Sequence, residues 1–235
     1  MDTQFTYYGH STFGLKINGH PILIDPFFTG NPTLDLSPDE LDADFILVTH
    51  GHGDHIGDTV RIAKRTDALV IACFEVANWL EEKGVKTHAQ HIGGGFQHPF
   101  GYVKMTQALH GSSLPDGSYG GMPGGFLITT EDNYTIYLAG DTGLFPGMSL
   151  IGDEGIDFAA LPIGDNFTMG PKDALRAVKL LKPRRVLPTH YSTFDLINQD
   201  PEQWKANVEA ETNSEVVILK PRQSIQLHQG PNHEA

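Results

Sequence analysis

The sequence predicts an α/β protein built as a four-layer sandwich, with two mixed β-sheets packed face to face and helices on both outer faces. Three observations predict this fold. Strand and helix patterns alternate in two rounds, antiparallel strands stand at both ends of the alternation, and the run Phe45–Val48 is apolar throughout, which is typical of a strand buried on both faces. The 235 residues contain no linker and no repeat by identity, so we expect 1–235 to form a single domain.

The chain begins with short antiparallel strands. Alternating or apolar patterns predict strands at 5–8, 13–17 and 22–24. Asn18-Gly19 separates the second from the third and is a typical hairpin turn. These three segments therefore form an antiparallel edge of the first sheet.

Units of one strand and one helix follow. A loop rich in Pro, Gly and Asp covers 26–44, with one helical turn expected after Ser37-Pro38, and the buried strand 45–48 leads into a helix at 56–65. The rest of the first round is a strand at 69–72, a helix at 74–83 that Gly84 ends, and strands at 103–109, 126–130 and 134–138.

The second round repeats the alternation. Pro171 starts a helix that ends at Leu181 and carries its apolar residues on one face. The other expected elements are strands at 158–161, 186–187 and 216–219, a helix at 201–210 and a frayed tail at 230–235.

Composition excludes several classes of protein. There are 29 acidic and 16 basic residues, so the formal charge is −13, which disfavours sequence-independent binding to nucleic acid or to anionic membranes. The single Cys73 excludes an internal disulfide and a cysteine-based zinc site, and we expect it to be a small buried apolar residue. No signal peptide and no apolar run of membrane-spanning length is recognisable, so a cytoplasmic location is expected.

One motif is the main functional signal. Thr49–His55, which follows the buried strand directly, has the pattern His-x-His-x-Asp-His, and such side chains bind zinc, iron or manganese. In an extended loop His50 and His52 point the same way and can hold one ion together. Asp54 and His55 lie where the chain turns into a helix and can face a second ion. The alternative is a polar loop with incidental histidines, and three His and one Asp within six positions speak against it.

Three further ligand candidates stand at strand ends. His110 follows the run 103–109, Asp141 follows 134–139 and His190 follows 186–189. Taken alone, each is more often a hydrogen-bonded polar residue or a cap. All three share the structural context of the motif, and this favours a common metal site.

These segments together resemble the metallo-β-lactamase superfamily, and more narrowly its branch of small prokaryotic metal-dependent hydrolases related to L-ascorbate-6-phosphate lactonase. The resemblance extends from residue 5 to about 228 and also rests on the segments Tyr8–Ser11, Ile24–Phe27 and Pro162–Gly170 and on the stretch after His190. It implies the αββα sandwich, here as an expectation.

The resemblance also implies ligand roles. Two divalent ions are expected, with zinc first and manganese or iron as alternatives. The first ion would be held by His50, His52 and His110. The second would be held by Asp54, His55 and His190, and Asp141 would bridge the two.

Two such ions predict hydrolytic chemistry. Cations roughly 3.5–4 Å apart can share a hydroxide and lower its pKa toward about 7, so that no Ser or Cys nucleophile is needed. The same ions polarise the carbonyl or phosphoryl oxygen under attack. Asp54 can orient the hydroxide as a catalytic residue. We therefore expect cleavage of a small ester, lactone or phosphodiester.

Other polar residues have weaker signals. His10 is either a catalytic and substrate-binding residue or a hydrogen-bonded structural histidine. Asp25 is either an outer partner of a ligand histidine or a turn residue before Pro26. Three polar residues of the loop 164–170 are candidates for substrate binding, namely Asp165, Asn166 and Thr168. The alternative is that they only form an ordinary turn. The run Lys182–Arg185 is expected to be a solvated connection rather than a phosphate anchor.

The sequence lacks features of two other branches of the superfamily. His52 stands where di-iron redox relatives have Glu, and only 45 residues follow His190, which leaves little room for the helical domain of glyoxalase II-like enzymes.

Two alternatives to a small-molecule hydrolase stay open. One alternative is a non-catalytic metal-binding or sensory protein on this fold. Another is a nuclease-type phosphodiesterase, since a dimetal cleft is locally positive. We expect a small-molecule substrate and no membrane partner, and the sequence leaves homo-oligomerisation open.

Overall fold

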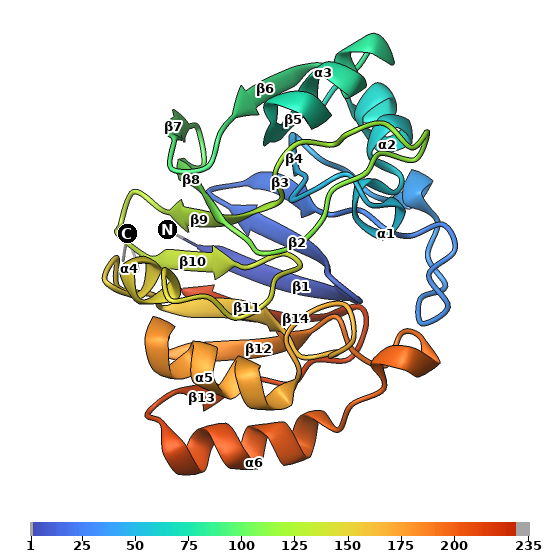
Figure 1. Cartoon of the computed structure of the whole chain (residues 1–235). Coiled ribbons are helices and arrows are strands. Elements are labelled where there is room, and N and C mark those ends of the chain that lie inside the picture. Colours follow the sequence, from blue (N-terminus) through green and yellow to red (C-terminus); the bar gives the residue numbers. More distant parts are fainter. Residues whose placement is uncertain (1, 229–235) are drawn as a thin grey trace.

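A computed structural model of the chain describes residues 2–228. The tail expected at 230–235 lies outside the described residues. The described part forms two seven-stranded mixed sheets that face each other, with helices outside (Figure 1). The predicted four-layer sandwich is thereby confirmed.

Sheet A has antiparallel and parallel halves. Its strands, in spatial order, are β14 (Gln223–His228), β1 (Thr3–Gly9), β2 (Thr12–Ile17), β3 (His20–Ile24), β4 (Phe45–Leu47), β5 (Leu69–Cys73) and β6 (Thr87–Gln90). Pairing is antiparallel from β14 to β3 and parallel from β3 to β6. The expected hairpin turn is present, with Asn18 and Gly19 both at positive φ, as a type I′ turn requires.

Sheet B, like sheet A, has an antiparallel half and a parallel half. Its strands, in spatial order, are β7 (Gly95–His98), β8 (Gly101–Gln107), β9 (Gly124–Thr129), β10 (Thr135–Leu138), β11 (Phe158–Pro162), β12 (Arg185–Thr189) and β13 (Glu215–Val216). Pairing is antiparallel from β7 to β10 and parallel from β10 to β13.

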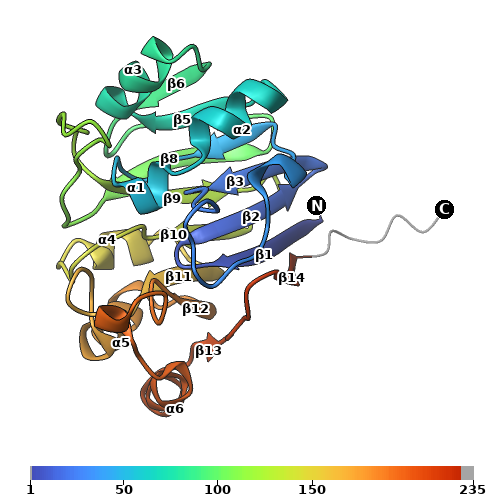
Figure 2. The same cartoon turned by 90° about the vertical axis from the view of Figure 1, so that its right-hand side faces the viewer.

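Helices cover the outer faces of the two sheets. Those of the first round, α1 (Gly53–Ile56), α2 (Thr59–Thr66) and α3 (Phe74–Glu82), lie on sheet A, and those of the second, α4 (Met148–Gly152), α5 (Pro171–Leu181) and α6 (Pro201–Glu211), lie on sheet B (Figure 2). Two short 3₁₀ turns complete the described elements, η1 (Pro38–Glu40) and η2 (Asp195–Ile197). Ser37 and Glu40 form a capping box around η1, the helical turn that the sequence predicts.

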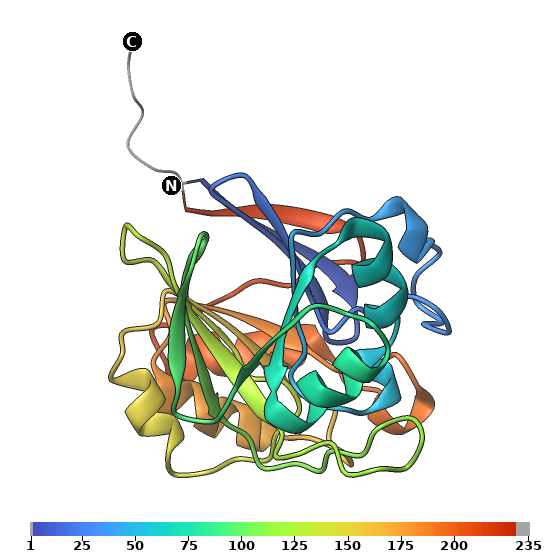
Figure 3. The same ribbon diagram turned by 90° about the horizontal axis from the view of Figure 1, so that it is seen from above.

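Alternating side chains build two apolar cores. In β10, Ile136 and Leu138 belong to the core between the sheets, whereas Tyr137 belongs to the core between sheet B and its helices. Aromatic rings join the sheets at Phe5 and Phe158, whose centroids lie 4.9 Å apart. The two sheets lie face to face (Figure 3), and the central strands β4, β10 and β11 are buried along their whole length.

The helix predicted at 56–65 differs from the structure. It is divided into α1 and α2 at Gly57, where φ is 34°. The buried Asp58 accepts hydrogen bonds from the backbone N–H groups of Phe28 and Thr29, at 3.0 and 2.8 Å. A Cβ on Gly57 would collide with the carbonyl oxygen of Pro26. These contacts with a distant segment interrupt the helix, and the separate short α1 presents Asp54 and His55.

Candidate metal centre

The ligand candidates lie at one edge of the sandwich because of strand direction. In sheet A, β1, β3 and β4 run the same way, and their carboxyl ends are followed by His10, Asp25 and the motif 50–55. In sheet B, β8, β10 and β12 run the same way and are followed by His110, Asp141 and His190. Residues from position 10 to position 190 therefore meet at one place.

A first group of donors comprises His50, His52 and His110. One nitrogen from each lies within 4.8 Å of the others. Thr49 orients His50, since its hydroxyl donates to Asp25 Oδ2 at 2.6 Å and accepts from His50 Nδ1 at 3.0 Å. This hydrogen bond leaves His50 Nε2 unprotonated, facing His52 Nδ1 at 2.9 Å.

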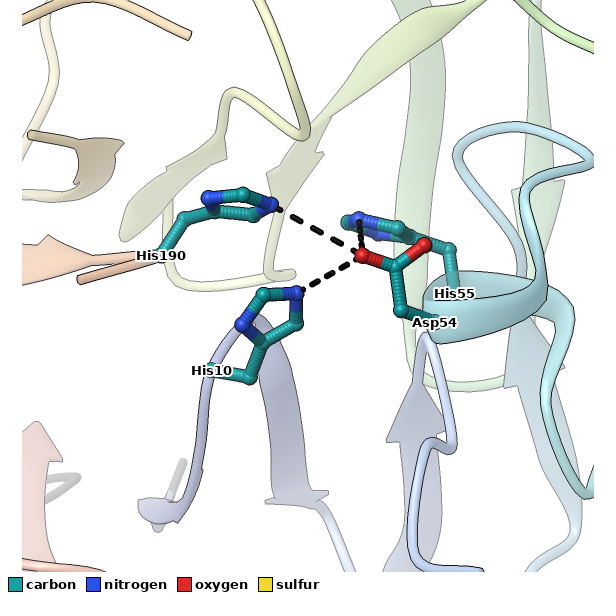
Figure 4. Close-up of side chains that lie close together, drawn as sticks. All are labelled: His10, Asp54, His55 and His190. Atoms are coloured by element: carbon teal, nitrogen blue, oxygen red, sulfur yellow. Dashed lines mark hydrogen bonds and ion pairs between the residues drawn. The ribbon is translucent and has the colours of Figure 1, made fainter. Parts of the chain in front are cut away.

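A second group comprises His10, Asp54, His55 and His190 (Figure 4). Asp54 Oδ2 lies 3.0 Å from His10 Nε2 and 3.9 Å from the Nε2 atoms of both His55 and His190. The sequence predicts three of these residues as ligands of one ion. It does not predict that His10 joins their group. His10 nevertheless follows the carboxyl end of β1, a strand that runs the same way as β3, just as the other candidates follow strand ends.

Asp141 lies between the two groups. Its Oδ2 is 3.0 Å from His190 Nε2, 3.3 Å from His55 Nε2 and 3.6 Å from His110 Nε2. His50, His55 and Asp141 form a third set of atoms within 4.8 Å of one another. A carboxylate that touches histidines of both groups fits the bridging role that the resemblance implies.

The converging atoms have the character of metal donors. Within residues 2–228, His55 Nε2, His190 Nε2 and Asp141 Oδ1 are buried without a hydrogen-bond partner. Such atoms normally cost free energy unless they have a partner, so an unbonded set of nitrogens and carboxylate oxygens pointing at one another fits a cation. Oxygen and imidazole donors without thiolate suit zinc, iron or manganese. Cys73 takes no part, because its thiol is buried and donates to the carbonyl of Gly120 at 3.2 Å.

Burial and nearby carboxylates shift the pKa values of the histidines in this cluster in opposite directions. Burial works to lower the pKa of His55, and the carboxylates of Asp141 and Asp25 outweigh it and hold that pKa well above its usual value. Burial lowers the pKa of His50, whose strongest charged neighbour is His55. Burial also lowers the pKa of His10 to about 4, so this imidazole is neutral near pH 7. Burial thereby favours the neutral forms of His10 and His50, and a histidine must be neutral at the nitrogen that binds a metal.

Asp25 is an outer partner of the cluster. Its Oδ2 lies 2.8 Å from His55 Nδ1, its Oδ1 accepts from the backbone N–H of Thr49 at 2.8 Å, and the residue is 1 % exposed. This contact makes His55 Nδ1 the donor and leaves Nε2 for the metal side. Of the two interpretations of Asp25, the structure favours the outer partner.

Replacing Asp25 by Asn should weaken metal binding. The amide cannot act as a full acceptor for both His55 Nδ1–H and Thr49, and loss of such outer partners costs about 10–100-fold in metal affinity or activity. Titration of the metal-free protein with Zn²⁺ measures the affinity. Asp44→Asn is the matched control, since Asp44 also pairs with a histidine, His20, at 2.7 Å, but on the exposed surface. Equal affinities for the two variants would contradict the role of Asp25.

The loop candidates are arranged differently from the ligands. Asp165 and Asn166 are exposed residues at positive φ in a turn closed by hydrogen bonds from Asp165 N to Met169 O and from Thr168 N to Asp165 O. Turn chemistry accounts for this geometry, and substrate binding by these residues stays a prediction. The turn nevertheless lies beside the cluster, because Met169 N donates to the carbonyl of Thr142 at 2.9 Å.

Thr142 connects the loops of the cluster, and the sequence gives no sign of it. Its hydroxyl accepts from the backbone N–H of Leu109 at 2.9 Å, and the residue is fully buried. Gly143 N donates back to the carbonyl of Leu109 at 2.9 Å. Thr142 thereby fixes the loop of His110 to the loop of Asp141.

The basic run Lys182–Arg185 lies far from the cluster. The run ends at Arg185, the first residue of β12, whereas His190 follows the last residue of that strand, so the length of β12, about 16 Å, separates them. Arg184 pairs with Asp157 at 3.2 Å, and Arg185 donates to the hydroxyl of Tyr134 at 2.8 Å. This position agrees with the expected solvated connection. It is too far from the cluster for the run to anchor a phosphate there.

Comparison with known proteins agrees with the fold and the cluster. Residues 20–191 match the beta-lactamase superfamily domain. The chain is 53% identical over 230 residues to a UPF0173 metal-dependent hydrolase of Bacillus cytotoxicus and 54% identical over 229 residues to one of Anoxybacillus flavithermus; each match covers 95% of this chain and all of the relative. Among solved structures it is similar to Igni18, a metallo hydrolase of Ignicoccus hospitalis, with a TM-score of 0.89, 35% identity, and coverage of 98% of this chain and 100% of that one.

Proposed function

The chain belongs to the metallo-β-lactamase superfamily and is a metal-dependent hydrolase, and from this premise we propose that it uses a dinuclear centre to cleave a small ester, lactone or phosphodiester. The convergence of seven predicted ligands from four separate loops onto one edge of the sandwich carries the proposal. Unbonded buried donors at Asp141 and His190 support it.

The proposed ligand sets follow the two groups. His50, His52 and His110 hold one ion, Asp54, His55 and His190 hold the other, and Asp141 lies between them. Two ions bound in this way supply a hydroxide nucleophile near neutral pH and polarise the oxygen of the scissile group. Zinc is the first candidate, with manganese and iron as alternatives.

The protein's own residues orient the chemistry. Asp54 is the partly open carboxylate of the cluster, with a side chain 33% exposed, whereas those of His55, Asp141 and His190 are buried. Burial works to raise the pKa of Asp54, but the hydrogen bond from His10 and the nearby histidines hold it below its usual value. Asp54 is therefore ionised and able to accept a hydrogen bond from the nucleophile and to orient it.

His10 is proposed as a positioning residue for Asp54. Its ring is 1% exposed, Nε2–H donates to Asp54 Oδ2 at 3.0 Å, and Nδ1 lies 3.0 Å from the hydroxyl of Thr193. With both nitrogens engaged, the geometry favours fixing the carboxylate over direct contact with substrate.

His10→Ala should lower kcat by about 10–100-fold, because the outer partner of a ligand is lost. His10→Gln, whose amide can still donate to Asp54, should recover part of that loss. Both variants should keep the metal content of the wild type, measured by atomic emission. Loss of one ion in both would show instead that His10 is itself a ligand.

A substrate panel tests the proposed function. Metal-free protein is reconstituted separately with Zn²⁺, Mn²⁺ and Fe²⁺, and turnover of 4-nitrophenyl acetate, a γ-lactone and bis(4-nitrophenyl) phosphate is measured. We expect hydrolysis of at least one class by wild type and none by His50→Ala. Silence of a protein that holds two ions, across all three classes, would favour the non-catalytic alternative.

No helix within residues 2–228 is long and apolar enough to cross a membrane.

A further inference from the structure

Three loops beside the candidate metal centre carry exposed apolar side chains. The loops are 108–123 after β8, 164–170 after β11 and 191–200 after β12. They hold six of the ten large hydrophobic residues that are exposed in the described part of the chain, namely Leu109, Tyr119, Met122, Phe167, Phe194 and Leu196. Apolar side chains that line a common pocket mark a binding site more often than scattered ones do, and Leu109, Tyr119 and Met122 line one pocket.

The first of these loops forms a pocket that reaches the cluster. The pocket has a volume of about 350 Å³, and His110 is part of its wall. Leu109, Tyr119 and Met122 line it and are 48, 68 and 58% exposed. A group bound in this pocket therefore lies next to a proposed metal ligand and against an apolar surface.

The pocket is held in place by hydrogen bonds at both ends of the loop. Ser112 Oγ accepts from the N–H of Gly51 at 3.1 Å and donates to the carbonyl of Gly120 at 2.8 Å. At the tip of the loop, Trp79 Nε1 donates to Asp116 Oδ2 at 2.6 Å. Because these bonds join the loop to the motif and to α3, the pocket is formed before a ligand enters.

The charge of the loops disfavours an anionic ligand. None of the three loops contains Lys or Arg. Exposed carboxylates stand in each of them, at Asp116, Asp165 and Asp195. The basic run Lys182–Arg185 lies at the far end of β12, of which Arg185 is the first residue. A charged group such as a sugar phosphate would therefore find no cationic side chain from these loops and would meet like charge.

We propose, on the basis of the proposed hydrolase function, that the substrate is an ester or lactone with an uncharged apolar acyl group. This group lies in the pocket of Leu109, Tyr119 and Met122, with the scissile carbonyl directed at the cluster next to His110. The pocket selects for apolar acyl groups by burial and against anionic ones because its loops supply carboxylates and no cationic side chain.

A matched pair of esters tests the inference. 4-Nitrophenyl butyrate and 4-nitrophenyl hydrogen succinate have acyl chains of equal length with a methyl group and a carboxylate at the end, and their spontaneous hydrolysis provides the reference rates. We expect the metal-loaded wild type to prefer the butyrate in kcat/KM by at least about tenfold.

Two variants test whether the pocket causes the preference for the butyrate. Met122→Lys adds a cation to the pocket and should lower the ratio of butyrate to succinate by about tenfold. Tyr119→Ala should reduce kcat/KM for the butyrate by about tenfold through KM. Phe96→Lys is the control, since Phe96 is 49% exposed but lies in β7, opposite Val103 of β8, and should leave the ratio unchanged.

The outcomes separate this inference from the proposed function. Preference for the succinate, or a ratio that Met122→Lys does not change, overturns the inference and leaves the hydrolase proposal intact. If neither ester is cleaved, ester hydrolysis fails, and calorimetric binding of the corresponding 4-nitroanilides decides the inference. Tighter binding of the butanamide supports it, and tighter binding of the succinamic acid overturns it.

Discussion

Asp141→Asn should abolish hydrolysis and remove at least one metal ion. The carboxylate is 3% exposed and lies within 3.6 Å of nitrogens of His55, His110 and His190. A neutral amide of the same shape removes the one buried negative charge that contacts both donor groups. Since loss of an outer partner already costs about 10–100-fold, loss of this ligand should cost on the order of 10³-fold or more in kcat/KM.

Steady-state kinetics and elemental analysis of the same sample check this result. Asp157→Asn is the control, because Asp157 also accepts a backbone hydrogen bond, from Thr135 at 2.9 Å, but precedes β11 at the opposite end of sheet B. The control should keep two ions and normal turnover. Wild-type metal content and activity in Asp141→Asn would exclude a bridging role for this residue.

Removal of the metal should have a comparably large effect on activity and a measurable effect on stability. Without a cation, the buried atoms His55 Nε2, His190 Nε2 and Asp141 Oδ1 have no hydrogen-bond partner. Ions present at 100 times their dissociation constant stabilise the native state by about 2.7 kcal/mol. For a chain of this length, we expect chelation to lower the Tm by about 5–10 °C.

Dialysis against a chelator, followed by calorimetry and an activity assay, measures both effects. Activity and Tm should return together when the correct divalent ion is added, and the ion that restores both at the lowest concentration identifies the preferred metal. An unchanged Tm with full activity after exhaustive chelation would show that the cluster binds no functional ion. His50→Ala should already have the low Tm and should not respond to added metal.

The part of the site that could be predicted from the sequence lies where strand direction decides the geometry. His110, Asp141 and His190 were predictable because each follows a strand with a clear apolar pattern, and parallel strands end at a common edge. The motif 50–55 follows the most apolar of these strands. Helix α5 was predicted at both ends because Pro171 fixes its start and an apolar face continues to Leu181.

The remaining features depend on contacts that are distant in sequence. The break at Gly57 arises because Asp58 binds the backbone of residues 28 and 29, and no local pattern encodes that contact. Strand β14 was missed because its sequence is mostly polar and exposed, and its pairing with β1 defines it. The membership of His10 in the second donor group has the same cause, since β1 and β12 meet only in the folded sandwich.

The pairing of β1 with β14 has a consequence for the order of folding. Phe5 pairs with Ile225, so the first strand finds its outer neighbour only after nearly the whole described chain has left the ribosome. The donors at positions 10 and 190 come together under the same constraint, through the bond from His190 N to His10 O. Contacts of such long sequence separation form slowly and late. The full set of donors therefore exists only once residue 190 has been synthesised, and a truncated chain that ends before residue 190 carries an incomplete set of donors.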